Sequence, residues 1–477
     1  MTPMLLAAAA ALIATPAAAS DAVRGAESAF TSPNGVAERC VRIAPMPGAD
    51  YDKDDLEEAE AFCAIDLYAP TVALCPKTWS TSPGMMVYDL SEGPYAGDRA
   101  RFERDACKEG KGAKDLAKDD LAKFKPTMNA EGTSGTFSPS PLLYYHFSRY
   151  FGLDAKVPVA VWRSMDRQAH LTEVARPAIA ISGHAHSGRM NHEGWRTLVS
   201  ADENPESYSP TDDLFTADRT AVYGVMVLSP GHRYGSEVNG TRKSGWGEGQ
   251  SRDFQQTPPF LALRSTKPLA EAIAEGLAQG RRDPQIAKDL GPETPPQQMA
   301  YWMREISEIV LMDFIFSQQD RIGNIDFEPY FYWVVNGKLE HKKAKHHELG
   351  DGEVPADALL IRRTRLNDND AGARVQYANF AKSTGMLEAL RRFDADIYRK
   401  LMALDADLQA QGPIHGWLVG SFGLDAAQVK QIVTNANLAA GILRGACERG
   451  ELTFDLSPKH FFVEGAVAPE AVDCAGK

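Results

Sequence analysis

Residues 308–326 read EIVLMDFIFSQQDRIGNID, an apolar run followed by a loop that is rich in carboxylate and amide side chains. Apolar residues recur at helical spacing through the first nine positions, so the sequence predicts a buried helix ending near residue 316. The loop after it carries four chemically capable side chains: Asp320, Arg321, Asn324 and Asp326. An ordinary surface turn has a similar composition, so the rest of the chain must decide whether this loop carries chemistry.

The chain has 477 residues, of which 44% are hydrophobic and 24% are charged, values that are typical of a globular protein with a substantial core. Its net charge of −13 arises from 51 basic and 64 acidic side chains. Nucleic acids and anionic membranes repel a negative chain, so the composition argues against both as non-specific partners.

The first residues, MTPMLLAAAAALIATPAAAS, have the pattern of a secretory signal peptide. A short apolar run ends in three alanines, Ala17 to Ala19, which suit a signal-peptidase site. We therefore expect residues 1–19 to be removed and the mature chain to be periplasmic or secreted. The run is too short to span a bilayer comfortably, and no later segment is apolar enough, so no stable membrane insertion is expected.

Six cysteines follow the signal: Cys40, Cys63, Cys75, Cys107, Cys447 and Cys474. An even number of cysteines in an exported chain indicates disulfide bonds. Six cysteines allow 15 connectivities, and pairing within the two groups along the chain is the simplest of them. We predict Cys447–Cys474 as the single best pair. The spacings lack paired C-x-x-C, which argues against a structural zinc site.

The chain also suggests a division into segments. Residues 20–115 are loop-rich and hold four cysteines, so we expect a disulfide-containing N-terminal extension. Residues 121–166 read as strand, small-residue loop, helix and strand. Beyond the opening stretch, PYFYWVVNGKLEH predicts two short strands around Asn336-Gly337, and ALLIRRTRLNDNDAG predicts a strand that ends in an acidic turn. The remainder, to about residue 445, reads as mostly helical.

Two lysines and a loop of small residues come first among the candidate site residues. Lys123 and Lys125 lie on one face of a predicted strand, because side chains alternate along a strand. The loop that follows contains four small residues: Gly132, Thr133, Ser134 and Gly135. Small residues let the backbone approach phosphate groups closely, and a lysine beside them can hold the phosphates of a nucleotide.

Acidic and amide residues come next in the chain. Asp320 and Asn324 follow the apolar helix, and Asp368 lies 48 residues after Asp320 in LNDNDAG. Phosphoryl transfer needs one carboxylate to orient or deprotonate the attacking hydroxyl, and an amide with a second carboxylate to hold Mg²⁺ against the phosphates. The order of these residues therefore indicates phosphoryl transfer from a nucleotide.

This ordered set resembles the atypical kinases, which include phosphoinositide kinases, the HipA toxin kinases and the secreted kinases of the casein-phosphorylating type. AKFKP, a helix and VPVAVWR look like their small lobe, QQDRIGN like their DRxxxN catalytic loop, and LNDNDAG like their metal-binding turn. The resemblance covers about residues 120–400. It implies an α+β, two-lobed protein-kinase-like fold, with a small β-rich lobe at 116–235 and a larger, mostly helical lobe at 236–477.

The resemblance also implies roles for individual residues. Asp320 would be the catalytic aspartate, with Arg321 beside it, and Lys125 with its small-residue loop would bind the phosphates of ATP. Asn324 and Asp368 would hold Mg²⁺ or Mn²⁺. Asp326 is the alternative to Asn324, and Asp370 competes with Asp368 for the second carboxylate role. The implied activity is transfer of phosphate to a hydroxyl of a protein or small-molecule acceptor.

Two departures from the family pattern leave alternatives open. The family usually separates the catalytic aspartate and the metal-binding asparagine by five positions, but Asp320 and Asn324 are four apart. Either the loop is one residue shorter or Asp326 takes the metal role. The helix usually carries a glutamate that pairs with the lysine, but PLLYYHFSRYF has no acid, so Asp166 or Glu173 would supply the partner. A nucleotide-binding pseudokinase without turnover is the alternative function that this loss predicts.

Histidines predict a third function. The segments SGHAHSGRMNHEGW and HKKAKHHELGDGE hold six of them: His184, His186, His192, His341, His346 and His347. H-x-H can bind zinc or copper through both imidazoles, and a metallohydrolase would combine such ligands with a metal-bound water. The sequence contains neither H-E-x-x-H nor G-x-S-x-G, so a metallohydrolase ranks third and an esterase triad has no support.

Overall fold

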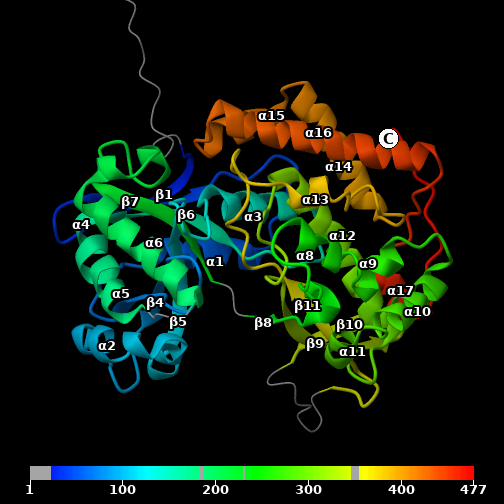
Figure 1. Ribbon diagram of the computed structural model, residues 1–477, viewed down its shortest axis with the longest axis horizontal. Helices are drawn as coiled ribbons and strands as arrows, with labels where there is room; N and C mark the ends of the chain where they lie inside the picture. The colour runs from blue at the N-terminus through cyan, green and yellow to red at the C-terminus, as the bar shows by residue number, and fades with distance from the viewer. Residues whose placement is uncertain (1–22, 183–185, 229–230, 345–353, 477) are drawn as a thin grey trace, which may run out of the picture.

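The computed structural model describes residues 23–182, 186–228, 231–344 and 354–476, and the expected signal peptide lies outside them. The fold is α+β, with two sheets in two lobes (Figure 1). Among the described helices, none combines the length and the apolar character that a bilayer span requires. One hydrophobic core runs through both lobes.

Seven antiparallel strands form the larger sheet, in the order β1-β2-β6-β7-β5-β4-β3. Their bounds are β1 (Gly25–Thr31), β2 (Ala37–Ile43), β3 (Val72–Pro76), β4 (Met85–Asp89), β5 (Asp119–Pro126), β6 (Ala160–Asp166) and β7 (Ala221–Val227). The central strands β6 and β7 are buried throughout; β7 is accordingly apolar along its length, whereas β6 also buries Arg163, Ser164 and Asp166. Strands β1 to β4 come from the cysteine-containing segment 20–115, so this segment is built into the sheet rather than appended to it.

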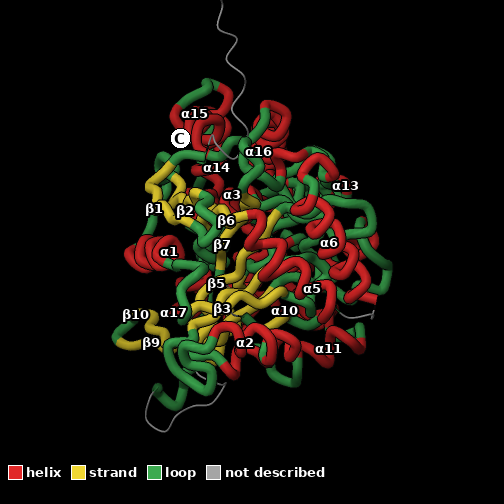
Figure 2. Tube along the Cα trace, turned by 90° about the vertical axis from the view of Figure 1, so that its left-hand side faces the viewer, coloured by secondary structure: helices red, strands yellow, loops and turns green. Residues whose placement is uncertain are grey.

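Helices cover both sides of this sheet. In Figure 2 its strands run between α1 (Lys53–Ala64) on the left and α5 (Arg176–Ile181) with α6 (His186–Glu203) on the right. The almost fully buried helix α3 (Pro139–Phe151) packs on β6 and β7 and ends at Gly152, which has a left-handed backbone. The other α-helices described in this lobe are α2 (Arg99–Asp105) and α4 (Arg167–Ala169).

The larger lobe is built around α12 (Pro296–Phe316), which is buried from residue 298 to its end. The predicted buried helix at 308–316 is therefore confirmed. The other helices are α7 (Ser236–Asn239), α8 (Glu248–Phe254), α9 (Pro258–Leu263), α10 (Leu269–Gly280), α11 (Pro284–Leu290), α13 (Phe380–Ser383), α14 (Ala395–Gln409), α15 (Pro413–Ser421), α16 (Ala426–Glu448) and α17 (Pro458–Glu464).

A small antiparallel sheet belongs to this lobe. It consists of β8 (His232–Arg233), β9 (Asp326–Val335), β10 (Lys338–Lys343) and β11 (Leu359–Arg365). The predicted hairpin is confirmed: Asn336 and Gly337 join β9 to β10 with φ angles of 51° and 72°. The sheet matters for the site because β9 begins where the 317–325 loop ends, and β11 leads directly into LNDNDAG.

Three disulfides connect the six cysteines: Cys40–Cys63, Cys75–Cys107 and Cys447–Cys474. The predicted pair Cys447–Cys474 is confirmed. Disulfides are typical of proteins that fold outside the reducing cytosol, so the set agrees with a secreted or extracytoplasmic chain.

Replacing both Cys40 and Cys63 with alanine is expected to lower the free energy of unfolding by about 3 kcal/mol. The bond closes a loop with a sequence separation of 23, and opening it gives that loop back its freedom in the unfolded state. Urea unfolding of the variant beside the wild-type chain measures the loss. A loss below about 1 kcal/mol would contradict this account.

Candidate active site

A cleft of about 320 Å³ brings together residues from all three groups that the sequence singled out. The site residues expected from sequence that line it are Lys125, Ser134, Gly135, Asp320, Asn324, Asp368 and Asp370. Lys125 comes from β5 in the small lobe, whereas Asp320 and Asp368 follow α12 and β11 in the large lobe. The cleft therefore joins segments that are far apart in the sequence.

Lys125 has an acidic partner, but neither of those considered from sequence. Its ammonium group forms an ion pair with Asp370 in the LNDNDAG turn. Asp166 accepts hydrogen bonds from Ser32 and from Asn34 instead, and Glu173 pairs with Arg99. Burial opposes the charge on Lys125, but the carboxylates of Asp370 and Asp368 raise its pKa above the ordinary value. A buried lysine held in its charged form suits an anionic ligand.

The loop after α12 reverses direction through two unusual backbone positions. Ser317 ends the helix in a left-handed conformation, with φ 52°, and Gly323 has φ 90°. The φ of Gly323 lies in the region that other residues rarely adopt, so this turn favours glycine. The Asn324 side-chain amide donates to the backbone carbonyl of Asp320 at 2.7 Å, which fixes the two residues against each other.

The four-residue spacing between Asp320 and Asn324 therefore works as a shorter loop. Asn324 lines the cleft, whereas Asp326 begins β9 and contacts Arg233 and Asn367. Of the two alternatives left open by the sequence, the geometry favours Asn324 at the cleft. Asp326 stands behind it.

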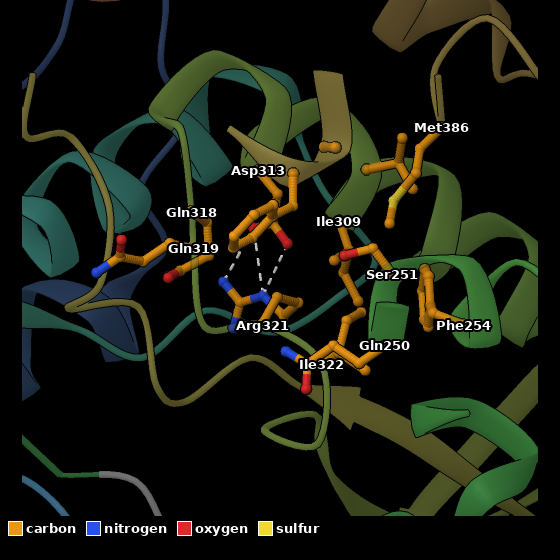
Figure 3. A pocket seen from close by; sticks show the side chains of 13 residues that line it. Gln250, Ser251, Phe254, Ile309, Asp313, Gln318, Gln319, Arg321, Ile322 and Met386 are labelled. Atoms are coloured by element: carbon orange, nitrogen blue, oxygen red, sulfur yellow. Dashed lines mark hydrogen bonds and ion pairs between the residues drawn. The ribbon is translucent and has the colours of Figure 1, made fainter. Parts of the chain in front are cut away.

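Arg321 does not line the cleft. Its buried guanidinium donates to the Asp313 carboxylate of α12 at 3.0 Å and to Asn369 Oδ1 at 2.7 Å. Figure 3 shows the Arg321 side chain pointing at Asp313. Tyr144 of α3 donates to the same carboxylate at 2.7 Å. Arg321 therefore positions the loop by tying it to α12, to α3 and to the LNDNDAG turn.

Three other residues expected at the site lie outside this cleft. Lys123 is a half-buried neighbour on β5, and Thr133 lines an adjacent cavity. Gly132 is an exposed residue of the small-residue loop. The loop itself is closed by mutual backbone hydrogen bonds between Met128 and Thr136, and this closure brings Ser134 and Gly135 to the cleft.

Arg233 of β8 joins the acidic and amide groups of the site. Its guanidinium contacts Asn324 Oδ1, Asp326 Oδ1 and, at 3.1 Å, Asp368 Oδ2. Side-chain oxygens of three residues, from the loop that leads into β9 and from the LNDNDAG turn, therefore converge on one cationic group. Such a set of hard oxygen donors has the chemistry of a Mg²⁺ or Mn²⁺ site.

Among the described residues, no group of three or more His, Cys, Asp or Glu side chains is arranged to hold a metal ion. A phosphate-bound Mg²⁺ does not require such a group, because it is held by one or two carboxylates together with substrate phosphates and water. Asn324, Asp368 and Asp370 fit this sparse ligand set.

The charges of the cleft shift the pKa values of its titratable groups. Burial raises the pKa of Asp320 to about 6, and the nearby carboxylates of Asp370 and Asp368 add to the rise. Burial also opposes ionisation of Asp368, but the surrounding lysines hold the pKa of that carboxyl well below its usual range. Two aspartates of one site therefore differ strongly in acidity, as expected for different roles.

Sequence reasoning missed the hairpin loop between β3 and β4. Its residues Trp79 to Ser82 line the cleft, and the amide of Asn191 on α6 holds the loop by donating to the carbonyls of Lys77 and Ser82. Burial and the charges of neighbouring lysines lower the pKa of Lys77 to about 7. The signal was present as KTWSTSPG, a small polar run between two apolar strands that precede the lysine strand.

The histidine hypothesis falls largely outside the described residues. His184, His346 and His347 are not described, and nothing is described of the His186 side chain. His192 contacts the Ser182 hydroxyl at 2.6 Å, and the His341 ring stacks on Tyr332. The metallohydrolase remains a prediction without structural support.

No protein-family model matches this chain, and no curated protein was found to match it. The assignment of this cleft as the candidate active site therefore depends on its geometry.

Proposed function

We propose that the chain is an exported, ATP-dependent phosphotransferase of the atypical-kinase type, which transfers the γ-phosphoryl group to a hydroxyl. One observation carries the proposal: a buried lysine, a small-residue loop and an aspartate of pKa about 6 share one cleft with Asn324 and two further aspartates. Phosphoryl transfer depends mainly on positioning and on neutralising charge, and these groups supply both.

The phosphates would bind on the small-lobe side of the cleft. Strands β3, β4 and β5 are neighbours in the sheet, and Lys125 lies on β5, just as the phosphate-binding lysine of protein kinases lies on a strand of the small lobe. The β3–β4 loop supplies Ser80, Thr81 and Ser82 beside it, where hydroxyl and backbone groups can cover the phosphates. Lys77 adds a second amine to the same wall, and bound phosphates would favour its charged form because its pKa is lowered to about 7 in their absence.

Asn324 and Asp368, with Asp370 beside them, would hold the metal, which neutralises phosphate charge when it is bound. Arg233 must then leave these oxygens, and its half-exposed side chain has room to do so. Asp320 would accept the proton of the attacking hydroxyl. A pKa of about 6 leaves most of this carboxylate ionised at neutral pH and still basic enough to accept a proton.

The rate of transfer is expected to rise with pH up to about 6 and then to level off. The base form of Asp320 is required, and its pKa of about 6 makes the rate rise tenfold per pH unit below that value. Measuring kcat between pH 4.5 and 8 with saturating metal and ATP tests this. A rate that stays flat from pH 5 to 7 would exclude Asp320 as the base.

Mass spectrometry of the disulfide-intact chain with ATP and Mg²⁺ or Mn²⁺, in the presence of peptide and small-molecule acceptors, tests the activity itself. An acceptor that gains the mass of phosphate with the wild-type chain, but not with Asp368→Ala, establishes transfer. No modified acceptor, together with no ATP-dependent rise in melting temperature, would overturn the proposal.

A nucleotide-binding pseudokinase is the second candidate. The ion pairs of Lys125 with Asp370 and of Arg233 with Asp368 favour it, because they occupy groups that turnover needs. Metal-dependent nucleotide binding without transfer to any acceptor would distinguish this function from the first.

Arg233→Gln is expected to tighten Mn²⁺ binding about tenfold in the presence of a non-hydrolysable ATP analogue. The change removes the guanidinium that contacts Asn324 and Asp368, so the metal no longer competes with a tethered cation. Titration calorimetry measures the affinity, and Arg252→Gln, at an exposed surface pair with Glu248, is the matched control. Weaker Mn²⁺ binding would show instead that Arg233 helps to form the site.

A further inference from the structure

A second cavity, of about 630 Å³, adjoins the cleft at Asp320. The two cavities share four residues: Thr81, Ser134, Gly135 and Asp320. Lys125 and Asp368 line the first cavity and not the second. A molecule in the second cavity would therefore meet the Asp320 carboxylate without occupying the phosphate side.

Trp246 is the most distinctive residue of this cavity. Its side chain is 64% exposed, yet its indole N–H donates to Asp320 Oδ1 at 3.4 Å and its ring meets Phe380 edge to face at 5.2 Å. Gly245 and Gly247 on either side have φ angles of 82° and 84°, a backbone that other residues rarely adopt. The chain thus holds a large apolar surface in water beside the catalytic aspartate, as a ligand platform requires.

Uncharged polar groups form much of the remaining wall. Asn129, Gln319 and Gln376 contribute carboxamides, and the buried Tyr377 hydroxyl donates to Asn129 Oδ1. Arg374 also lines the cavity, and its guanidinium forms an ion pair with the Asp213 carboxylate at 2.9 Å. Apart from the Asp320 carboxylate at its junction with the cleft, this wall offers hydrogen bonds in both directions and no unpaired charge among its described residues.

We propose that the acceptor is a hydroxyl of a neutral saccharide, an inference that rests on the proposed phosphotransferase function. A sugar ring presents an apolar C–H face that can stack on an indole, and hydroxyls at its rim that suit carboxamides. The volume of the cavity lies within the range of small-molecule sites, about 300–1,000 Å³.

The transfer balances with the groups at hand. The sugar hydroxyl oxygen forms a bond to the γ-phosphorus, and the bond from that phosphorus to the oxygen shared with the β-phosphate breaks. ADP leaves with the electron pair of that bond. The hydroxyl proton passes to the Asp320 carboxylate and then to water.

Binding of the saccharide is tested separately from transfer. Saturation-transfer NMR with maltose, cellobiose, lactose and chitobiose is expected to show binding of at least one of them to the full chain. Trp246→Ala should weaken that binding more than tenfold, whereas Trp246→Phe should stay within about threefold. Trp333→Ala, on β9 and outside both cavities, is the matched control. No binding to the wild-type chain overturns the inference, and so does equal binding by Trp246→Ala.

Transfer from labelled ATP to these sugars, beside equimolar serine and threonine peptides, separates the two proposals. Label on a sugar and not on peptides supports the saccharide acceptor. Label on peptides alone overturns the acceptor class and leaves the phosphotransferase standing. Sugar binding that depends on Trp246, in a chain that labels no acceptor and whose melting temperature does not respond to ATP, supports the saccharide site and overturns the phosphotransferase.

Discussion

Replacing Asp320 with asparagine is expected to lower kcat by about a thousandfold while making the folded chain more stable. The loss of rate follows from the loss of the group that accepts the hydroxyl proton, a role that is worth about 10²–10⁴ in rate. The shape of the side chain is retained, so the binding of ATP should persist. Transfer assays at saturating acceptor measure the loss of rate, and a separate measurement of ATP affinity shows whether binding persists.

The gain in stability follows from the pKa of Asp320. Burial raises it from 3.8 in the unfolded chain to about 6 in the folded chain, so the folded state binds the proton more tightly than the unfolded state does. Below about pH 4 the carboxyl is protonated in both states and does not oppose folding. As the pH rises from about 4 to about 6, the unfolded state loses its proton first, so the free energy of unfolding falls over this range. Asparagine stays neutral at every pH, so at pH 7 the variant should gain about 3 kcal/mol, and at pH 4 or below almost nothing.

The matched control is Asp396→Asn, an exposed position of α14 that pairs with Arg399 on the surface. It should change neither kcat nor the free energy of unfolding by a measurable amount. Urea unfolding at pH 4 and at pH 7 provides the comparison. If Asp320→Asn destabilised the chain at pH 7, the ionised carboxylate would stabilise the fold. It would then not be a catalytic group whose burial lowers the free energy of unfolding.

Local patterns predicted the elements that frame the site. The spacing of EIVLMDFIF predicted the end of α12, and the strand–loop–helix–strand reading of residues 121–166 corresponds to β5, α3 and β6. The hairpin at Asn336-Gly337 was readable because its turn chemistry is set by two adjacent residues. In each case residues close together in the sequence determine the local structure, so this single sequence was sufficient to predict the element.

The parts that could not be predicted depend on distant partners. Strands β1 to β4 read only as loop-rich sequence, because their pairing with β5 and β6 is set by the whole sheet. The partner of Lys125 was expected at Asp166 or Glu173, but it lies 245 residues away at Asp370. Arg233 gave no local signal at all, since its role comes from three oxygens that meet only in the folded chain.

Replacing Lys125 with methionine is expected to abolish the ATP-dependent rise in melting temperature and to lower transfer by at least a hundredfold. Lys125 is the buried cation of the cleft, and loss of one pre-organised charged donor typically costs about 10²–10³ in rate. Lys118→Met, at a half-exposed lysine that precedes β5, is the matched control and should leave both properties unchanged.

The ligand-free chain should also lose stability, because Lys125→Met leaves Asp370 as a buried carboxylate without its partner. Breaking one side of a buried ion pair costs about 3–5 kcal/mol. Adding Asp370→Asn removes the unpaired charge and should restore most of that stability, since two neutral side chains of similar size then replace the pair. It should not restore the binding of ATP, because the cation is still missing. Recovery of both properties in the double variant would mean that Lys125 serves only the fold, and that the phosphates are held by Lys77 or elsewhere in the cleft.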